Sequence, residues 1–207
     1  MSEPVHLSIV IPAFNEAGRL GPTLDAIEAF RRSRRYTSEV IVVDDCSLDG
    51  TARLAEMFAA GKDGYRILKN ERNLGKGGAV RRGLLEARGA YRLFTDADLS
   101  TPIEQVDSFF PFFDGTADGT RYDIVIGSRR VRGARLDKRQ PIHRESAGRL
   151  YSLLVRLLAL RGFLDTQCGF KMFTARAAEE VCRRQTVTGF GFDVELLYIA
   201  VKVLRLK

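Results

Sequence analysis

The chain has few residues of the types that build several common functional sites. Its two histidines are His6 and His143, which argues against a histidine-rich metal site. The three cysteines, Cys46, Cys168 and Cys182, are odd in number and lack C-x-x-C spacing. We therefore expect neither a disulfide framework nor a cysteine zinc site, and this cysteine usage is typical of a reducing compartment.

Long apolar runs are also missing. No stretch approaches the roughly 18–20 apolar residues that span a bilayer, and no signal peptide precedes the first apolar run. With 45% apolar and 29% charged residues, the chain has the composition of a soluble globular protein. We expect a cytoplasmic protein with one domain, residues 1–207.

Positive charge is concentrated in one segment. The net charge is +7, and residues 129–149 hold eight Lys or Arg residues against two acidic ones. Such a segment favours a phosphorylated substrate, a polyanion or an anionic membrane surface, although a solvated basic loop has the same composition. Aromatic residues do not interleave its arginines, which argues against nucleic acid as the partner.

Short apolar runs alternate with helical patterns along most of the chain. The runs predict buried strands at residues 7–12, 39–43, 65–69, 91–95 and 123–127. The helical patterns between them cover residues 19–35, 51–60, 75–87 and 102–113. This alternation predicts an α/β fold with a mostly parallel sheet and helices on both faces.

The pattern changes after the fifth expected strand. Residues 144–161 are predicted to form a very apolar helix, which suits either the core or an interface with a membrane. Beyond it we expect a short strand that starts near residue 170, a helix at 175–184, and a last helix from about 192 that continues to the end of the chain.

Polar residues follow four of the expected strands. They are Asn15-Glu16, Asp44-Asp45, Asp96 with Asp98, and Arg129. In open α/β sheets, ligands bind at the carboxyl ends of the strands. Four such clusters therefore predict one shared site.

Asp96 and Asp98 are the centre of this prediction. On an extended backbone, their i, i+2 spacing points both side chains to one face. Two close carboxylates repel each other, and Mg²⁺ or Mn²⁺ removes the repulsion and also binds diphosphate. The pair predicts a metal–nucleotide site, with a surface turn rich in Asp and Ser as the alternative.

The other clusters fit a nucleoside diphosphate sugar. Asp44 or Asp45 can accept the imide N–H of uracil, and Glu16 with the backbone around Ala13 can hold the ribose and the base edge. Lys76 lies in a glycine-rich turn that opens a helix, where the glycines leave room for diphosphate. A solvated lysine is the alternative, and the G-x-x-x-x-G-K-[ST] loop of ATP-hydrolysing proteins is absent.

Arg129, Arg144 and the basic segment are candidates for binding an acidic acceptor. A phosphate monoester has a second pKa of about 6, so its nucleophilic oxygen is already deprotonated at neutral pH. A hydroxyl acceptor would need a carboxylate base instead. Asp193 and Glu195 are the candidates, although both also suit the first turn of a helix, where carboxylates complement the helix dipole.

Six sequence blocks carry a resemblance to known enzymes. Residues 9–16 (IVIPAFNE), 42–51 (VVDDCSLDGT), 73–77 (NLGKG) and 96–98 (DAD) resemble family 2 glycosyltransferases of the GT-A fold. Residues 165–173 (DTQCGFKMF) and 192–200 (FDVELLYIA) resemble dolichyl-phosphate β-glucosyltransferases. Arg129, in Gly-Ser-Arg, and Arg144 resemble the arginines that bind acceptor phosphate in polyprenyl-phosphate mannose synthases.

This resemblance implies an activity. It is the inverting, metal-dependent transfer of a hexose, expected to be glucose from UDP-glucose, to a polyprenyl or dolichyl phosphate. The protein would act as a peripheral protein on the cytoplasmic face of a membrane. Residues 1–130 would form the half that binds the nucleotide sugar, and residues 131–207 the half that binds the acceptor.

The resemblance also implies a set of site residues. The nucleotide-sugar site would include Pro12, Phe14 and Ala97 in addition to the residues above. The metal would be held by Asp96 and Asp98, with Mg²⁺ or Mn²⁺ as the cofactor. The residues expected to take part in catalysis are Asp98, Arg129, Arg144 and Asp193.

The sequence departs from these relatives in several places. We expect no N-terminal membrane anchor and no later membrane helices. Ser100 stands where the mannose synthases have a metal-binding Gln, so a site with two aspartates is expected. Gly189-Phe190-Gly191 replaces a bulkier Arg-Trp, which leaves the sugar open. Two alternative functions remain: transfer to a soluble or glycan hydroxyl, and regulation by nucleotide-sugar binding without turnover.

Overall fold

The computed structural model of the chain describes residues 4–128 and 165–207. The strands in this part are β1 (Leu7–Ala13), β2 (Ser38–Asp44), β3 (Tyr65–Lys69), β4 (Tyr91–Thr95), β5 (Ile124–Ile126) and β6 (Phe170–Thr174). The α-helices are α1 (Ala17–Arg32), α2 (Thr51–Ala59), α3 (Gly75–Glu86), α4 (Phe110–Asp114), α6 (Ala175–Arg184) and α7 (Phe192–Tyr198). A 3₁₀-helix, η1 (Ile103–Ser108), precedes α4, and a π-helix, η2 (Ile199–Val203), follows α7.

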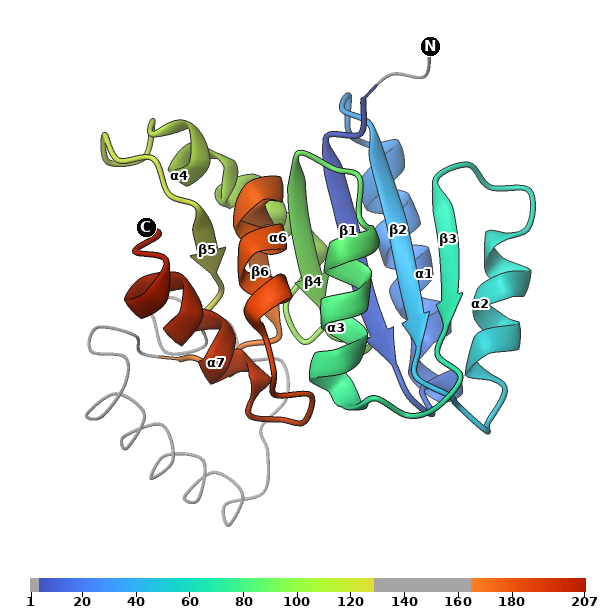
Figure 1. Ribbon diagram of the computed structural model, residues 1–207. Helices are drawn as coiled ribbons and strands as arrows, with labels where there is room; N and C mark the ends of the chain where they lie inside the picture. The colour runs from blue at the N-terminus through green and yellow to red at the C-terminus, as the bar shows by residue number, and fades with distance from the viewer. Residues whose placement is uncertain (1–3, 129–164) are drawn as a thin grey trace, which may run out of the picture.

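The six strands form one sheet in the order β3-β2-β1-β4-β6-β5 (Figure 1). β3, β2, β1 and β4 run parallel to one another. β6 lies between β4 and β5 and is antiparallel to both. All seven residues of β1 are buried, as expected for a central strand that is covered on both faces.

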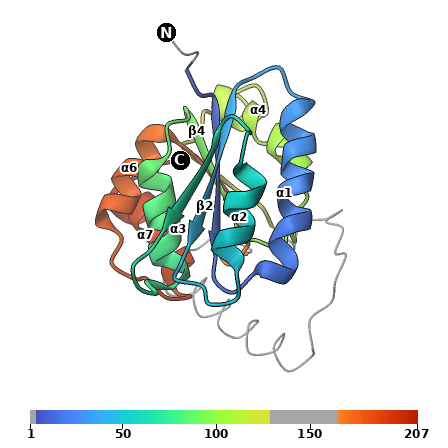
Figure 2. The same cartoon turned by 90° about the vertical axis from the view of Figure 1, so that its right-hand side faces the viewer.

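Two hydrophobic cores lie on opposite faces of the sheet. One contains the buried residues Leu20, Leu24, Ile27 and Phe30 of α1, packed with α2 and η1 against β1 and β2. The other is formed by α3, α6 and α7 against the opposite face. Figure 2 shows α1 and α2 on one side of the sheet and α3, α6 and α7 on the other.

The structure confirms the predicted fold class, an α/β fold with a mostly parallel sheet. The expected strands and helices of the first hundred residues are all present, within three residues of their predicted ends. The expected helix at 102–113 is wrong in one respect, because it is divided into η1 and α4. Pro111 lacks an N–H and is favoured in the first turn of a helix, and α4 begins next to it.

The end of the chain also differs from its prediction. The last helix begins at Phe192 as expected, but helical structure stops at Val203. The carbonyl of Lys207 accepts hydrogen bonds from the amides of Asp123 at 2.7 Å and Ile124 at 3.1 Å. The C-terminal residues therefore lie against β5. The apolar helix expected at 144–161 lies outside the described residues.

Candidate active site

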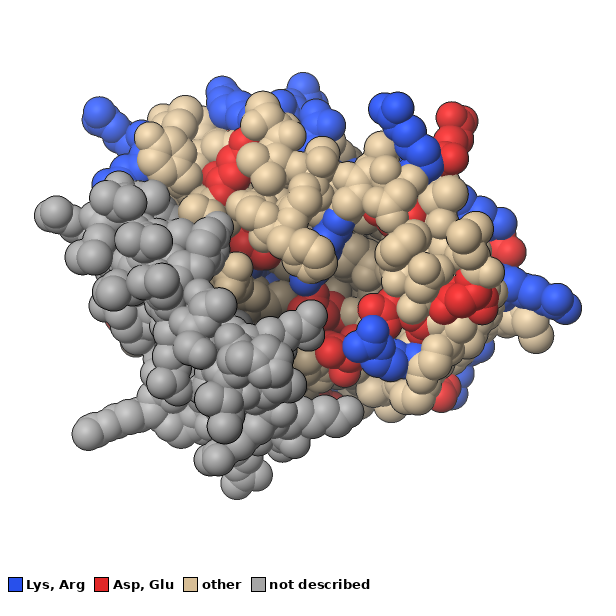
Figure 3. Space-filling view, turned by 90° about the horizontal axis from the view of Figure 1, so that it is seen from below, with Lys and Arg blue, Asp and Glu red and all other residues tan. Residues whose placement is uncertain are grey.

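The carboxyl ends of β1, β2 and β4 meet at one edge of the sheet, called the site edge here. Ala13 at the end of β1 is the register partner of Asp44 at the end of β2. After β4, the Asp96 amide donates to the carbonyl of Gly169, which precedes β6, at 3.1 Å. Figure 3 views the molecule from this side and shows acidic side chains gathered around a hollow. The polar clusters predicted after β1, β2 and β4 therefore share one edge.

The loop after β1 is fixed to the loop after β2. Pro12 and Ala13 are buried at the end of the strand, whereas Phe14 is 47% exposed. Asn15 has a positive φ of 55°, and its amide donates to the Ser47 hydroxyl at 2.9 Å. This hydrogen bond holds the loop that carries Phe14 at the site edge.

Glu16 directly precedes α1 at the same edge. Its amide donates to the Thr51 hydroxyl at 2.8 Å, which ties α1 to the start of α2. Its carboxylate forms an ion pair with Arg19 at 2.7 Å. Glu16 thus lies at the site edge with its carboxylate paired to a neighbouring guanidinium, and its contact with ribose stays a prediction.

The two aspartates at the end of β2 have different partners. Asp45 Oδ1 accepts from the Asn70 side chain at 2.6 Å and from the Leu74 amide at 2.8 Å, so it anchors the loop between β3 and α3. Asp44 Oδ2 accepts from the Ser47 amide at 3.3 Å. Asp44 Oδ1 is buried and has no hydrogen-bond partner among the described residues. A buried acceptor without a donor is costly, so Asp44 is the better candidate for contact with a ligand.

Lys76 and Asp96 form an ion pair at the site edge. Lys76 Nζ lies 2.6 Å from Asp96 Oδ1, and both side chains are partly exposed. Lys76 is in the first turn of α3, and Asp96 directly follows β4. The structure thus brings the predicted diphosphate ligand and one predicted metal ligand into direct contact.

Asp98 is exposed and belongs to a tight local turn. Its Oδ1 accepts from the amide of Ser100 at 3.0 Å and from its hydroxyl at 2.7 Å. Ala97, between the two aspartates, is buried, and its carbonyl accepts from the Thr23 hydroxyl at 2.6 Å. Both aspartates line a pocket of about 120 Å³, whose other lining residues are Ser100, Thr101, Gln167, Cys168 and Gly169.

The pocket suits a cation with oxygen ligands. Two carboxylates face it, and one of them already attracts an ammonium group. Within the described residues, no group of three His, Cys, Asp or Glu side chains could hold a metal ion. A divalent metal bound to Asp96 and Asp98 would therefore complete its coordination with diphosphate oxygens and water, as Mg²⁺ commonly does.

Gly169 and Lys171 were not among the predicted site residues, but they contact Asp96 and Asp193, which were. A Cβ atom at Gly169 would overlap the Asp96 carboxylate, so only glycine allows this close approach. Lys171 on β6 is completely buried. The sequence signal that points to both is the block at residues 165–173, which contains them.

Asp193, in the first turn of α7, forms a buried ion pair with Lys171. The distance from Lys171 Nζ to Asp193 Oδ1 is 2.5 Å. Burial raises the pKa of Asp193, the ammonium groups of Lys171 and Lys76 oppose the rise, and Asp96 adds to it. Asp193 therefore lies within electrostatic reach of the Lys76–Asp96 pair.

The contacts of Glu195 indicate a structural role. Its carboxylate accepts from the amide of Thr186 at 3.0 Å, from the Thr186 hydroxyl at 2.6 Å and from the amide of Val187 at 2.8 Å. These bonds hold the segment between α6 and α7. Asp193, by contrast, interacts electrostatically with Lys76 and Asp96.

The glycine-rich turn at the start of α3 packs closely against the segment before α7. The amides of Gly77 and Gly78 donate to the Thr188 carbonyl, at 2.7 and 3.3 Å. A Cβ atom at Gly77 would overlap the Phe192 side chain. These glycines therefore admit the segment before α7, and the room for diphosphate beside Lys76 stays a prediction.

Several predicted features lie outside the described residues. These are Arg129, Arg144, the basic segment and the apolar helix at 144–161. Their part in the site stays a prediction. Among the helices of the described residues, none has the length and apolar character needed to cross a membrane.

Comparison with known protein sequences identifies a family and relatives that share one name. The family model for glycosyl transferase family 2 matches residues 8–182. A dolichyl-phosphate beta-glucosyltransferase of Trichomonas vaginalis is 37% identical over 202 residues, which cover 95% of this chain and 60% of that protein. The dolichyl-phosphate beta-glucosyltransferase of Drosophila melanogaster is 39% identical over 207 residues, which cover 96% of this chain and 64% of that protein. The chain spans less than two thirds of the length of these relatives.

Solved structures show the same fold. Glucosyl-3-phosphoglycerate synthase from Mycobacterium tuberculosis, in complex with Mn²⁺, UDP and glucosyl-3-phosphoglycerate, has a TM-score of 0.70 at 22% identity, covering 97% of this chain and 66% of that chain. Mannosyl-3-phosphoglycerate synthase from Rubrobacter xylanophilus has a TM-score of 0.59 at 24% identity, covering 83% and 53%. The predicted GT-A fold is confirmed.

Proposed function

The chain belongs to glycosyl transferase family 2, and from this premise we propose that it transfers glucose from UDP-glucose to a polyprenyl phosphate such as dolichyl phosphate. The observation that carries the proposal is the arrangement of Asp96, Asp98 and Lys76 at the site edge. It joins two carboxylates and an ammonium group where a diphosphate and its metal would bind. The names of the relatives support glucose as the sugar and dolichyl phosphate as the acceptor.

Asp44 is proposed to select the uracil base. Its buried Oδ1 has no partner among the described residues, and the uracil imide N–H would supply the missing donor. Asp45 then acts indirectly, because its bonds to Asn70 and Leu74 fix the loop beside the base. Pro12, Ala13, Phe14 and Glu16 would line the same side of the nucleotide.

The diphosphate is proposed to lie between Lys76 and the two aspartates. A divalent metal held by Asp96 and Asp98 would neutralise the negative charge that develops on the leaving UDP. Lys76, which contacts Asp96, is close enough to bind the same diphosphate. Ala97 would fix the spacing, because its buried carbonyl is bonded to Thr23.

The transfer is proposed to be a single displacement. The acceptor oxygen forms a bond to the anomeric carbon while the bond from that carbon to UDP breaks, which inverts the configuration. A phosphate acceptor arrives ionised at neutral pH and needs no general base. Asp193 can then remain paired with Lys171, and Arg129 and Arg144 would bind the acceptor phosphate.

The polyprenyl acceptor implies contact with a membrane surface. We propose a peripheral position on the cytoplasmic face, mediated by the basic segment at residues 129–149. Residues 131–207 would then form the acceptor half and residues 1–130 the donor half of one catalytic domain.

One observation favours a second candidate, transfer to a hydroxyl group. Asp193 is a buried carboxylate with a raised pKa near Lys76 and Asp96, which are properties of a general base. In that reaction Asp193 would accept the proton of the hydroxyl as the new bond forms.

A panel of nucleotide sugars, tested with Mn²⁺ or Mg²⁺ and a short polyprenyl phosphate, distinguishes these functions. Formation of a glucosyl lipid phosphate together with UDP is the expected result, and the β anomer would support inversion. Product with hydroxyl acceptors alone would favour the second candidate. Tight UDP binding without any product would indicate a regulator and contradict the proposal.

A further inference from the structure

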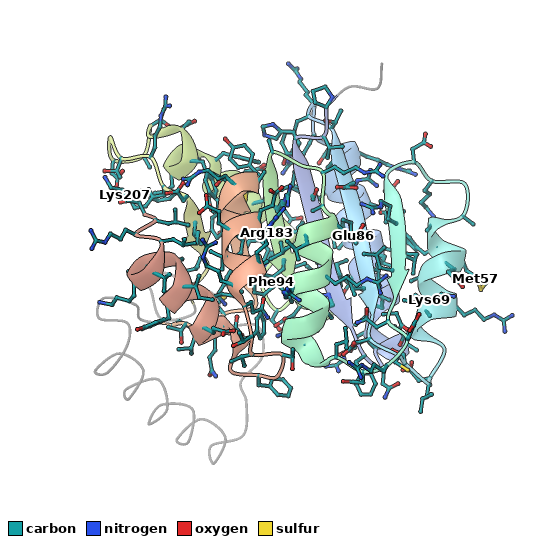
Figure 4. All side chains as sticks on the ribbon, in the orientation of Figure 1. Met57, Lys69, Glu86, Phe94, Arg183 and Lys207 are labelled. Atoms are coloured by element: carbon teal, nitrogen blue, oxygen red, sulfur yellow. The ribbon has the colours of Figure 1, made fainter. Side chains whose placement is uncertain are left out.

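Lys171 is a buried cation beside the candidate site. Its side chain is completely buried on β6, opposite Phe94 in the register of β4. The ammonium lies 5.2 Å from the centre of the Phe94 ring, which is labelled in Figure 4 between the sheet and its covering helices. Burying a charge is expensive, and an apolar residue of similar size would often serve stability as well.

The two hydrogen-bond acceptors of Lys171 explain what the cation does. Its Nζ donates to the Cys168 carbonyl at 2.6 Å and to Asp193 Oδ1 at 2.5 Å. Cys168 directly precedes Gly169, whose carbonyl accepts from the Asp96 amide and whose Cα lies against the Asp96 carboxylate. One ammonium group therefore links the turn that supports Asp96 to the start of α7.

We propose that Lys171 is a positioning residue: its ammonium group fixes the Cys168–Gly169 turn and the Asp193 carboxylate around Asp96, and so sets the geometry with which Asp96 meets the donor. This inference rests on the proposed function, because it needs Asp96 to take part in binding the metal and the diphosphate. It adds a residue of the acceptor half to the donor site.

The chain offers a matched control. Arg92 is a second buried cation on the same face of the same pair of strands, at the opposite end of β4. It donates to the Leu84 carbonyl at 2.8 Å and forms an ion pair with Glu179 at 2.9 Å. Loss of its charge should affect folding as loss of the Lys171 charge does, without reaching the site edge.

The test compares Lys171→Met, Arg92→Met, Asp193→Asn and the double variant of Lys171→Met with Asp193→Asn. Calorimetry measures the affinity for UDP in the presence of Mn²⁺, and thermal unfolding measures stability. We expect Lys171→Met to weaken UDP binding by about tenfold, the size of one lost hydrogen bond to a charged group. Arg92→Met should lower the melting temperature but keep the parental affinity.

The double variant keeps the test valid if Lys171→Met alone does not fold, because it leaves no unpaired charge buried. Its UDP affinity should be as low as that of Lys171→Met, whereas Asp193→Asn alone, which retains the bond to Cys168, should lose less affinity than either. Parental affinity in the double variant, or equal losses in Lys171→Met and Arg92→Met, would overturn the inference. If the parent chain binds UDP but forms no product, only the proposed transfer fails; if it binds no nucleotide, both fail.

Discussion

At the scale of single residues, Asp98 is the position where the site and a simple turn are hardest to tell apart. Its carboxylate accepts from both the amide and the hydroxyl of Ser100, which is the bonding of an ordinary Asx turn. Asp114 makes the same two bonds to Thr116, at 2.9 and 2.7 Å, in a turn that follows α4. The same turn therefore occurs both at the site edge and away from it.

Comparison of Asp98 with Asp114 gives a direct prediction. Asp98→Asn should reduce the affinity for UDP in the presence of Mn²⁺ by at least about tenfold, because a site with two carboxylates loses one charged ligand. Asp114→Asn should leave that affinity unchanged. Titration calorimetry with and without Mn²⁺ measures both, and equal behaviour of the two variants would assign Asp98 to the turn alone.

Lys76 gives a second prediction at this scale. The Lys76 ammonium is paired with the Asp96 carboxylate, so a metal ion that binds Asp96 without nucleotide must compete with Lys76. Lys76→Met should therefore bind Mn²⁺ alone about 1.5- to 5-fold more tightly, the range expected for loss of one partly exposed ion pair. The same variant should bind UDP more weakly, because a positive charge beside the diphosphate is lost.

Manganese binding can be followed by electron paramagnetic resonance, which requires no turnover. Lys62→Met is the control. Lys62 donates to the Phe58 carbonyl at the C-terminal end of α2, away from the site edge, and makes no contact with the site. Weaker binding of Mn²⁺ alone in Lys76→Met would contradict competition between the two cations.

At the scale of elements, the sequence predicted most of the strands because buried parallel strands are continuous apolar runs. β1 and β2 are such runs, and polar residues lie at or just after the end of each, at one edge of the sheet. The insertion of β6 between β4 and β5 was not predictable in this way. Its pairing depends on contacts between segments far apart in sequence, and a five-residue run does not specify its neighbours or its direction.

The segment before α7 shows a similar limit. The glycines at the start of α3 predict room for diphosphate, but they do not predict the close approach of the Thr188 carbonyl and the Phe192 side chain that the structure shows. Glycine removes an obstruction in either case, and sequence alone does not identify the approaching group. Lys171 was missed for a related reason, because a lysine within a short strand is normally expected at the surface.

A prediction for the segment between α6 and α7 concerns Glu195. Glu195→Gln should lower the free energy of unfolding by about 1–2 kcal/mol, because one carboxylate oxygen that accepts from Thr186 and Val187 is replaced by a donor. The amides of Val187, Gly77 and Gly78 should then exchange hydrogen faster. Urea unfolding and hydrogen exchange measure the two effects.

Glu180→Gln serves as the comparison on α6. Glu180 forms an exposed ion pair with Arg176 at 3.3 Å, and such pairs contribute little to stability. If Glu195→Gln and Glu180→Gln are equally stable and exchange at the same rate, Glu195 does not hold this segment in place.

At the scale of the whole molecule, one sheet separates two hydrophobic cores, and each core contains one buried cysteine. Cys168 belongs to the core formed with α1, and Cys182 on α6 belongs to the core formed with α3 and α7. Burial raises the pKa of the Cys182 thiol to about 12, so it stays protonated and unreactive near neutral pH. Cys46, at the site edge, is partly exposed.

These positions predict how the thiols respond to unfolding. Because both cores share the strands of one sheet, they should be lost together in a single cooperative transition. In a Cys46→Ser variant, Cys168 and Cys182 should resist maleimide without urea and become reactive at the same urea concentration, as followed by mass spectrometry of the two cysteine peptides. Native reactivity of either thiol, or two separate midpoints, would contradict one cooperative domain and would indicate that the two faces of the sheet unfold independently.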